Sequence, residues 1–528
     1  MDIGRALSEE KDNGRLLERI LRSAKELTGA DGGSLYLRTD DDHLRFEIIL
    51  TDSLDLYLGG THGRPIRFPP IPLFGLDGEP NNQMVAARAA TAKHTINIED
   101  AYAATGFDFS GTRLFDARNG YRSASFLTVP MLGQSDEVIG VLQLINAIDP
   151  MTREVVAFGP RDQQLAESLA SQAAIALTNK RLVDEQRYLF EAFIELMAGA
   201  IDDKSPYTGG HCRRVPELTM MLADAAAAQS DGPLRDFSMT DADRYELKIA
   251  GWLHDCGKIT TPEYIVDKAT KLQTIFDRIE LVQTRFELAM REAEVRTLRE
   301  KVKELSPDVE RDLGEIESVV STELSTLRDD YEFVSKANIG GEMMSDEHIE
   351  RVHHIASREV TIADGSVALL NEDEVKNLCI RRGTLTEEER EVINHHIVAT
   401  IKMLEALPYP PHLRRVPEFA GGHHERMDGR GYPRGLTREE MSVQARIMGI
   451  ADIFEALTAG DRPYKKAMPL SQALRILGSM KVDNHIDPDL FDVFMKERIY
   501  LRYAELFLPS EQVDEVDLAH IPGYISDS

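Results

Sequence analysis

Apolar and polar positions divide the chain into a mixed helix-and-strand region followed by a region of helices. Apolar residues from Leu16 to Leu27 recur at three- and four-residue spacing and predict a helix over 15–28. Short runs rich in β-branched and aromatic residues then predict strands at 34–37, 44–48, 123–130 and 138–145. Residues 1–160 are therefore expected to form an α+β domain.

A long helical pattern follows this domain. Proline is absent and glycine rare from 161 to 200, and an apolar stripe continues from Leu165 to Leu196. The pattern outlasts an ordinary globular helix, which favours a connecting helix over 161–200 that also forms a dimer contact. The alternative is a helix that packs only on the first domain.

Beyond residue 200, several predicted helices carry a histidine or an aspartate on an inward position. A single buried histidine is usually a core residue with an ordinary hydrogen-bond partner. Several metal-binding groups on inward or loop positions instead favour one shared metal site. The candidate ligands are His211, His254, Asp255, His396, His423, His424 and Asp452. They lie in two helical segments, 201–270 and 381–508, which are expected to form one domain.

An insertion over 271–380 separates these two segments. Two runs of helical spacing, broken at Ser306-Pro307-Asp308, predict an antiparallel helical hairpin about 40 Å long. No element is predicted for 342–380. The hairpin is expected to contact a partner or to limit access to the site, and the alternative is a solubilised decoration. Residues 509–528 are acidic and are expected to form a mobile tail.

Charge and cysteine content limit the partners. The 90 acidic residues against 61 basic ones give a net charge of -29, which argues against binding nucleic-acid polymers or anionic membranes. Three cysteines without CxxC spacing suit a reducing cytoplasm, and Cys256 is expected to be inert packing. No run of about 18 apolar residues predicts a membrane span.

Three motifs carry a family resemblance. They are His254-Asp255-Cys256-Gly257-Lys258, the segment 423–433 with its Gly431-Tyr432-Pro433 turn, and Ala451-Asp452-Ile453-Phe454-Glu455-Ala456-Leu457-Thr458. In this order they resemble HD-GYP proteins, HD-domain phosphohydrolases that hydrolyse cyclic di-GMP. The first domain resembles a GAF domain, a small-ligand sensor module, in its turn at 30–34 and its strand at 140–146. The resemblance implies a GAF-like sensor domain joined by a long helix to an all-α HD-GYP domain that carries the helical hairpin.

The resemblance also implies a binuclear metal site. All seven candidate residues would be ligands, with Asp255 bridging two divalent ions, and the mixed imidazole and carboxylate donors favour iron or manganese. Some relatives carry a glutamate where this chain has Tyr207, so two ions are expected rather than three. Glu455 replaces an aspartate and keeps the charge. His395 faces about 100° away from His396 on the helix and is left out.

The implied reaction is attack of a metal-activated water on a phosphodiester. Asp255 and Lys258 would be catalytic, with Lys258 stabilising charge on the phosphate. Cyclic di-GMP would be opened to pGpG, and whether hydrolysis continues to GMP stays open. A non-catalytic cyclic di-GMP receptor and another nucleotide phosphohydrolase are the alternatives. The ligand of the sensor domain is unidentified, and the expected substrate contacts are Gly431, Tyr432, Pro433, Arg462, Lys465 and Lys466.

Overall fold

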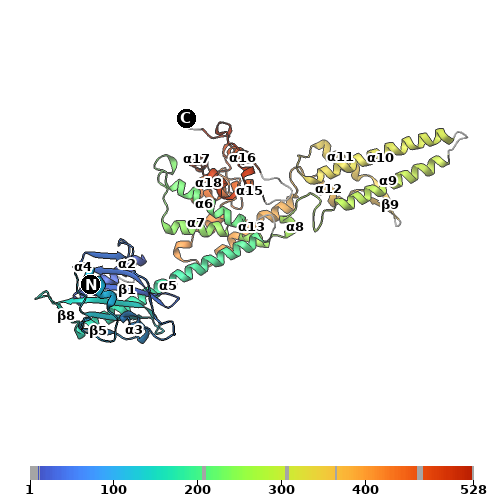
Figure 1. Cartoon of the computed structure of the whole chain (residues 1–528). Helices are drawn as coiled ribbons and strands as arrows, with labels where there is room; N and C mark the ends of the chain where they lie inside the picture. The colour runs from blue at the N-terminus through green and yellow to red at the C-terminus, as the bar shows by residue number, and fades with distance from the viewer. Residues whose placement is uncertain are drawn as a thin grey trace. The chain divides into compact units, whose positions relative to one another are not determined.

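The computed structural model describes residues 10, 12–204, 210–303, 309–362, 365–460 and 468–525, with the side chains of 309–312 excluded (Figure 1). The chain divides into two compact units, Met1–Phe190 and Glu191–Ser528, and each is described by itself. Within the described ranges, no helix is both long enough and apolar enough to cross a membrane.

The amino-terminal unit is built on one antiparallel sheet in the order β3-β2-β1-β7-β6-β5. Two short strands extend it, since β4 pairs with β2 and β8 pairs with β7. The predicted strands are confirmed at the centre of the sheet, and the short outer ones were missed. The strands are β1 Ala30–Arg38, β2 His43–Thr51, β3 Leu56–Gly59, β4 Ile71–Pro72, β5 Ile96–Ile98, β6 Phe126–Leu132, β7 Val138–Ile148 and β8 Val155–Val156.

Helices cover both faces of this sheet. Alternate residues of β7 point to opposite faces, so Leu142 joins the core under α2 (Asn13–Thr28) and α5 (Pro160–Asp202), whereas Val141 joins the core under α3 (Val85–Ala92). The helix α4 (Ser110–Asn119) lies between β5 and β6 in the chain. This arrangement confirms the predicted GAF-like α+β fold.

The helix α5 runs without interruption from Pro160 to Asp202. Residues from Ala166 to Leu177 belong to the core of the first unit, and Ile194, Ala198 and Ile201 belong to the core of the second. Residues 181–190, between these two parts, are all exposed.

The second unit contains an all-helical body with one apolar core, to which Val215, Phe454 and Phe494 contribute. Capping boxes begin two of its helices, at Thr240 with Asp243 and at the predicted pair Thr386 with Glu389. The helices are α6 His211–Ala227, α7 Asp241–Leu253, α8 Glu263–Val266, α13 Glu387–Glu405, α14 Val416–Gly421, α15 Val443–Thr458, α16 Leu470–Val482, α17 Pro488–Lys496 and α18 Ile499–Phe507. The 3-10 turns are η1 Gly232–Leu234, η2 Cys256–Thr260, η3 Pro411–Leu413 and η4 Arg438–Glu440.

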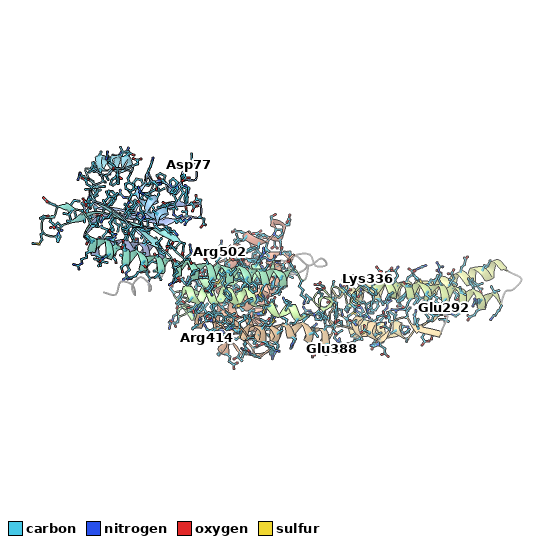
Figure 2. All side chains as sticks on the ribbon, turned by 90° about the horizontal axis from the view of Figure 1, so that it is seen from below. Asp77, Glu292, Lys336, Glu388, Arg414 and Arg502 are labelled. Carbon is cyan, nitrogen blue, oxygen red and sulfur yellow. The ribbon has the colours of Figure 1, made fainter. Side chains whose placement is uncertain are left out.

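The insertion forms the predicted helical hairpin. Its helices α9 (Ile279–Val302) and α10 (Val309–Ile339) lie side by side, as the ribbons in Figures 1 and 2 show. The ion pair between Arg296 and Glu323 fixes their antiparallel register. The 24 residues of α9 span about 36 Å, close to the expected length.

Residues 342–380, for which no element was predicted, complete the core of the insertion. They form α11 (Asp346–Ala356), the β9–β10 hairpin (Glu359–Ile362 and Gly365–Ala368) and α12 (Glu372–Leu378). Val352 and Leu378 are fully buried and pack in one cluster with Phe286 and Val334 of the long hairpin. The insertion is therefore a small folded subdomain rather than two helices alone.

The expectation of a mobile acidic tail is wrong for its described residues. The tail includes η5 (Ser510–Gln512) and η6 (Leu518–His520). The Gln512 amide donates to the backbone carbonyls of Thr458 (2.6 Å) and Met468 (2.8 Å), and Ile521 is buried in the core of the helical body. Together with the hydrogen bonds from Ser471 to Asp514, these contacts attach the described part of the tail to the helical body.

Candidate metal centre

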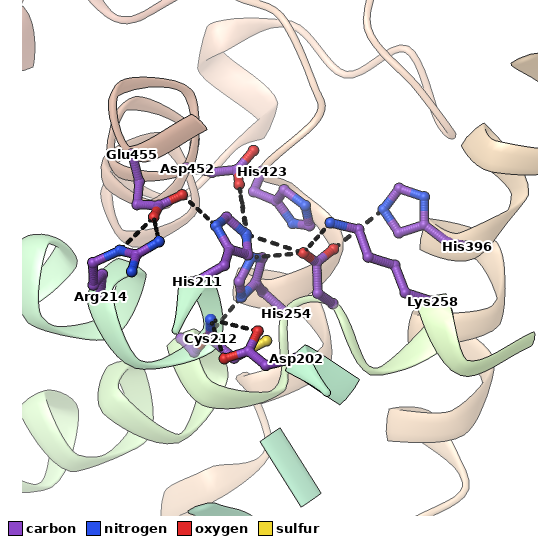
Figure 3. Close-up of polar contacts among 12 residues, drawn as sticks. Asp202, His211, Cys212, Arg214, His254, Lys258, His396, His423, Asp452 and Glu455 are labelled. Atoms are coloured by element: carbon purple, nitrogen blue, oxygen red, sulfur yellow. Dashed lines mark hydrogen bonds and ion pairs between the residues drawn. The ribbon is translucent and has the colours of Figure 1, made fainter. Parts of the chain in front are cut away.

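The seven candidate ligands come together in two adjacent groups. One group joins His211, His254, Asp255 and Asp452, and the other joins His396, His423 and His424; within each group all ligand atoms lie within 4.8 Å of one another. The side chains converge from separate helices of the same core, as Figure 3 shows for His211, His254 and His396. The loop after α14 supplies His423 and His424.

In the first group, two imidazoles and two carboxylates face a common point. Nε2 of His211 lies 3.2 Å from Nε2 of His254, 3.1 Å from Oδ2 of Asp255 and 3.3 Å from Oδ1 of Asp452. Nε2 of His254 lies 3.2 Å from the same Asp255 oxygen. Two imidazole nitrogens this close cannot both be unprotonated without a cation between them.

Asp255 connects the two groups. Its Oδ2 faces His211 and His254, whereas its Oδ1 lies 3.3 Å from Nε2 of His396 in the second group. Nε2 of His424 lies 3.2 Å from Nε2 of His396, and Nε2 of His423 is buried without a hydrogen-bond partner among the described residues. A carboxylate with one oxygen toward each group has the geometry expected of the predicted bridging ligand.

The backbone fixes which nitrogen of each histidine points inward. Nδ1 of His254, His396 and His423 lies 2.5–2.8 Å from the carbonyl oxygen of the residue three positions earlier. A donating Nδ1 leaves Nε2 with its lone pair toward the site. Metal-ligating histidines are typically held in this way. The donor set and the buried, unpaired Nε2 of His423 both fit two divalent ions.

The two groups have opposite electrostatic character. Burial lowers the pKa of His211, but hydrogen bonds to Asp255, Asp452 and Glu455 outweigh it and hold that pKa well above its usual range. The same balance raises the pKa of His254 to about 9. Burial instead lowers the pKa of His424 to about 4. The first group therefore favours positive charge, and His424 in the second group is neutral at pH 7.

An outer pair of residues, not predicted as part of the site, orients His211. Nδ1 of His211 lies 2.5 Å from Oε2 of Glu455, and Oε1 of Glu455 accepts from Nε of Arg214 at 2.7 Å. The Glu455 side chain is only 1% exposed. Arg214 lies three residues after His211 in the sequence, so helical spacing places both on one side of α6 and could have suggested the pair.

Lys258 lies at the edge of the centre. Its Nζ is 2.5 Å from Oδ2 of Asp255, and 29% of its side chain is exposed. Burial lowers its pKa, but Asp255 and Asp452 outweigh that effect and raise it, so the side chain is an ammonium. Burial raises the pKa of the neighbouring Cys256 thiol to about 11, consistent with the expected inert role.

The turn η2 lies directly against α13. A Cβ at Gly257 would be 2.0 Å from the carbonyl oxygen of His396, so only glycine fits there. The Gly257 amide also donates to Oγ1 of Thr400 at 2.9 Å. This contact holds the segment carrying Asp255 against the helix carrying His396.

The glycine-tyrosine-proline turn borders the second group. The ring of Tyr432 stacks on His424 with centroids 4.8 Å apart, and it is partly exposed. Buried Glu425 accepts from the backbone amides of Arg434 and Leu436 and so shapes the loop. A Cβ at Gly431 would lie 2.4 Å from the backbone of Glu425. Gly431 thus allows this close backbone approach, Pro433 follows Tyr432 through a cis peptide bond, and Tyr432 contacts a candidate ligand.

Some predicted residues cannot be placed. Arg462, Lys465 and Lys466, the expected phosphate contacts, lie outside the described residues, and so does Tyr207, on which the choice between two and three ions depends. The seven ligands, Lys258 and the turn around Tyr432 are the part of the expected site that the fold brings together.

Comparison with known protein families agrees with this organisation. Residues 12–177 match the GAF domain, residues 208–318 match the HD domain, and residues 372–490 match a second HD-domain model. The two HD matches include all seven candidate ligands.

Named relatives align with parts of the chain. A protein of Vibrio cholerae named 3'3'-cGAMP-specific phosphodiesterase 3 is 24% identical over 72% of this chain and 58% of its own length. A cyclic di-GMP phosphodiesterase of Thermotoga maritima is 35% identical over 22% of this chain and 32% of its own length. One from Pseudomonas aeruginosa is 36% identical over 22% of this chain and 26% of its own length. The chain thus spans less than two thirds of each of these relatives.

The fold and the family matches define a protein with an amino-terminal GAF domain and an HD domain. Within the HD-domain proteins, the resemblance of its motifs to the HD-GYP family is confirmed.

Proposed function

We propose that the chain is a metal-dependent phosphodiesterase that opens cyclic dinucleotides and is regulated by its GAF domain. The observation that carries the proposal is Asp255, whose two oxygens face two separate groups of ligands. Such a bridged pair of ions is the arrangement that two-metal phosphodiester hydrolysis requires. Iron or manganese suits the mixed imidazole and carboxylate donors.

The chain's own residues would divide the chemical work. Bound divalent ions supply Lewis acidity and an activated water. Asp255 and the six other ligands hold the ions, and the ammonium of Lys258, exposed at the edge, donates to a phosphate oxygen and stabilises its charge. Tyr432 offers an aromatic face beside the metals, and we assign the phosphate contacts of the substrate to Arg462, Lys465 and Lys466.

The nucleotide specificity has two candidates. The relatives from Thermotoga maritima and Pseudomonas aeruginosa are named for cyclic di-GMP, whereas the Vibrio cholerae protein that aligns with 72% of this chain is named for 3'3'-cGAMP. We propose cyclic di-GMP as the substrate, because the motifs around Tyr432 are those of the HD-GYP family. 3'3'-cGAMP is the alternative that the test includes.

The test is turnover by the full chain reconstituted with manganese or iron, followed by separation of the products. We expect cyclic di-GMP to yield pGpG, and the appearance of GMP would reveal a second hydrolytic step. His254→Ala and Asp255→Ala should each abolish turnover. Both cyclic di-GMP and 3'3'-cGAMP are supplied as substrates. A protein that holds its metals and binds cyclic di-GMP but cleaves neither of the two would instead be a receptor.

We also propose that the protein is a homodimer through α5. Ile175, Leu182, Leu189 and Leu196 recur every seventh residue, and each is 43–70% exposed. A strict seven-residue repeat is the pattern that pairs helices. A second such stripe, Leu281, Leu288, Val295 and Val302, lies exposed on α9 and supports a further contact through the insertion.

Sedimentation of variants tests the two contacts separately. Leu189→Glu with Leu196→Glu should produce monomers, and Leu288→Glu with Val295→Glu tests the insertion. Leu506→Glu, at a site 65% exposed on α18, serves as the control. A wild-type monomer would refute the dimer proposal.

A further inference from the structure

The carboxyl-terminal end of α5 contacts the helix that carries His211. Asp202, the last residue of α5, is 4% exposed, and both its carboxylate oxygens accept from the backbone amide of Cys212, at 3.1 and 3.2 Å (Figure 3). Cys212 directly follows the ligand His211 in the first turn of α6. Asp202 therefore holds the backbone of the first turn of α6, which carries His211.

Lys204, two residues after Asp202, contacts the segment 258–261 that follows Asp255 in the sequence. Its Nζ donates to the backbone carbonyl oxygens of Lys258 (3.1 Å), Ile259 (2.5 Å) and Thr261 (2.6 Å). These carbonyls lie at or just after the end of η2, and a single ammonium donates to all three; the Lys258 carbonyl also accepts from the Thr261 amide. Because η2 follows Asp255 and contains Lys258, Lys204 sets the position of both.

These two contacts have the form of a clamp. Asp202 and Lys204 are separated by one residue, carry opposite charges, and hold two segments that supply ligands to the same group of the metal centre. Hydrogen bonds to charged groups are short and directional. A shift of the end of α5 would therefore move the two segments that Asp202 and Lys204 contact. Misplacement of a reacting group by about 1 Å can cost about 100-fold in rate.

We propose that Asp202 and Lys204 are positioning residues that couple the end of α5 to the metal centre. Since α5 begins in the core of the GAF domain, a change there that displaces this helix would reach His211, Asp255 and Lys258 through these two side chains. The proposal deepens the proposed phosphodiesterase function and rests on it for its regulatory meaning.

The experiment compares Lys204→Met, Lys204→Arg and Asp202→Ala in the full chain. The matched control is Lys180→Met, which removes an ammonium from α5 itself, where Lys180 pairs with exposed Asp184. Three quantities are measured: manganese affinity of the metal-stripped protein, hydrogen exchange of amides 255–261, and kcat and KM for cyclic di-GMP.

For Lys204→Met we expect about 10-fold weaker manganese binding, faster exchange at 255–261, and kcat lowered about 10-fold or more with KM little changed. Lys204→Arg should restore these values, because a guanidinium can donate to the same carbonyls. Asp202→Ala should weaken manganese binding through His211, and Lys180→Met should change nothing.

Unchanged manganese affinity and exchange in a folded Lys204→Met protein would overturn the coupling. If Lys204→Met does not melt cooperatively, unchanged manganese affinity and hydrogen exchange in a folded Asp202→Ala protein would overturn the coupling instead. If the wild type binds manganese but cleaves no cyclic dinucleotide, the proposed function fails, whereas manganese affinity and exchange still decide the positioning role.

Discussion

Oε2 of Glu455 lies 2.5 Å from Nδ1 of His211, on the side of the ring opposite Nε2, the nitrogen that faces Asp255. The carboxylate is buried and paired with Arg214, so it holds the ring in one orientation and adds negative charge behind the site. The sequence had marked Glu455 only as a replacement for aspartate. From this contact we expect Glu455 to influence metal affinity.

Glu455→Gln should therefore weaken metal binding. The substitution replaces the charged acceptor of Nδ1–H by a weaker neutral one and removes the charge that favours a cation, and such substitutions typically cost 10- to 100-fold in affinity. Calorimetric titration of the metal-stripped protein with manganese measures the effect. Glu439→Gln, at an exposed position, is the control, and equal affinities of the two variants would contradict the assigned role.

Adjacent histidines on α13 provide an internal comparison. His396 is buried with Nε2 toward Asp255, whereas His395 is exposed, as its position about 100° away on the helix predicts. His396→Ala should lower the bound metal and reduce turnover by at least about 100-fold, since metal chemistry supplies the activated water. His395→Ala should leave both unchanged. Metal analysis with a turnover assay distinguishes the two.

Residues with periodic or motif signals were the predictable part of this molecule. The long helix α5, the capping box at Thr386 and the seven candidate ligands each carry such a signal, and the fold places them as expected. Asp202 and Lys204 carry none, because their partners are backbone atoms of Cys212 and of η2. A side chain that bonds to backbone atoms does not require a particular residue type at its partner's position. Such a contact therefore produces no motif in the sequence.

The spacing of apolar and polar residues also does not predict short elements. The strands β9 and β10 are four residues long each and α12 is seven residues long, too short for periodicity to emerge. They become ordered by packing on the hairpin helices, as Val360 and Leu378 show by their burial.

Gly431→Ala should disable the loop beside the second group of ligands. The added methyl would lie 2.4 Å from backbone atoms of Glu425 and Arg426, which cannot move aside without disturbing Glu425. We expect a lower melting temperature and loss of turnover. Gly341→Ala, where a Cβ would meet nothing within 4 Å, should behave as wild type. A fully active Gly431→Ala protein would contradict the required close approach.

Asp487 should make the stability of the helical body depend on pH. Its buried carboxylate caps α17 and pairs with Arg438 and Arg446. Burial raises its pKa, but these arginines and the backbone amides outweigh it and hold that pKa below the usual 3.8. The stabilisation is therefore complete above pH about 4 and is lost as the pH falls through the lowered folded pKa.

Asp487→Asn should cost about 3 kcal/mol at neutral pH, because two arginines lose their buried partner. Urea unfolding of metal-stripped wild type and variant at pH 7 and pH 3 measures the difference, which should narrow at the lower pH. If the difference in unfolding free energy between wild type and variant were the same at pH 7 and pH 3, the Asp487 carboxylate would be excluded as its source.

The contact between Gly257 and Thr400 bears on how the molecule assembles. These residues are 143 positions apart, and the entire insertion lies between them. The segments bearing His254 and His396 can meet only after that intervening subdomain has brought its own ends together, a closure whose entropy cost slows folding. The candidate metal centre is then a late product of folding, and metal added during refolding would report completion of the whole helical body rather than formation of either half.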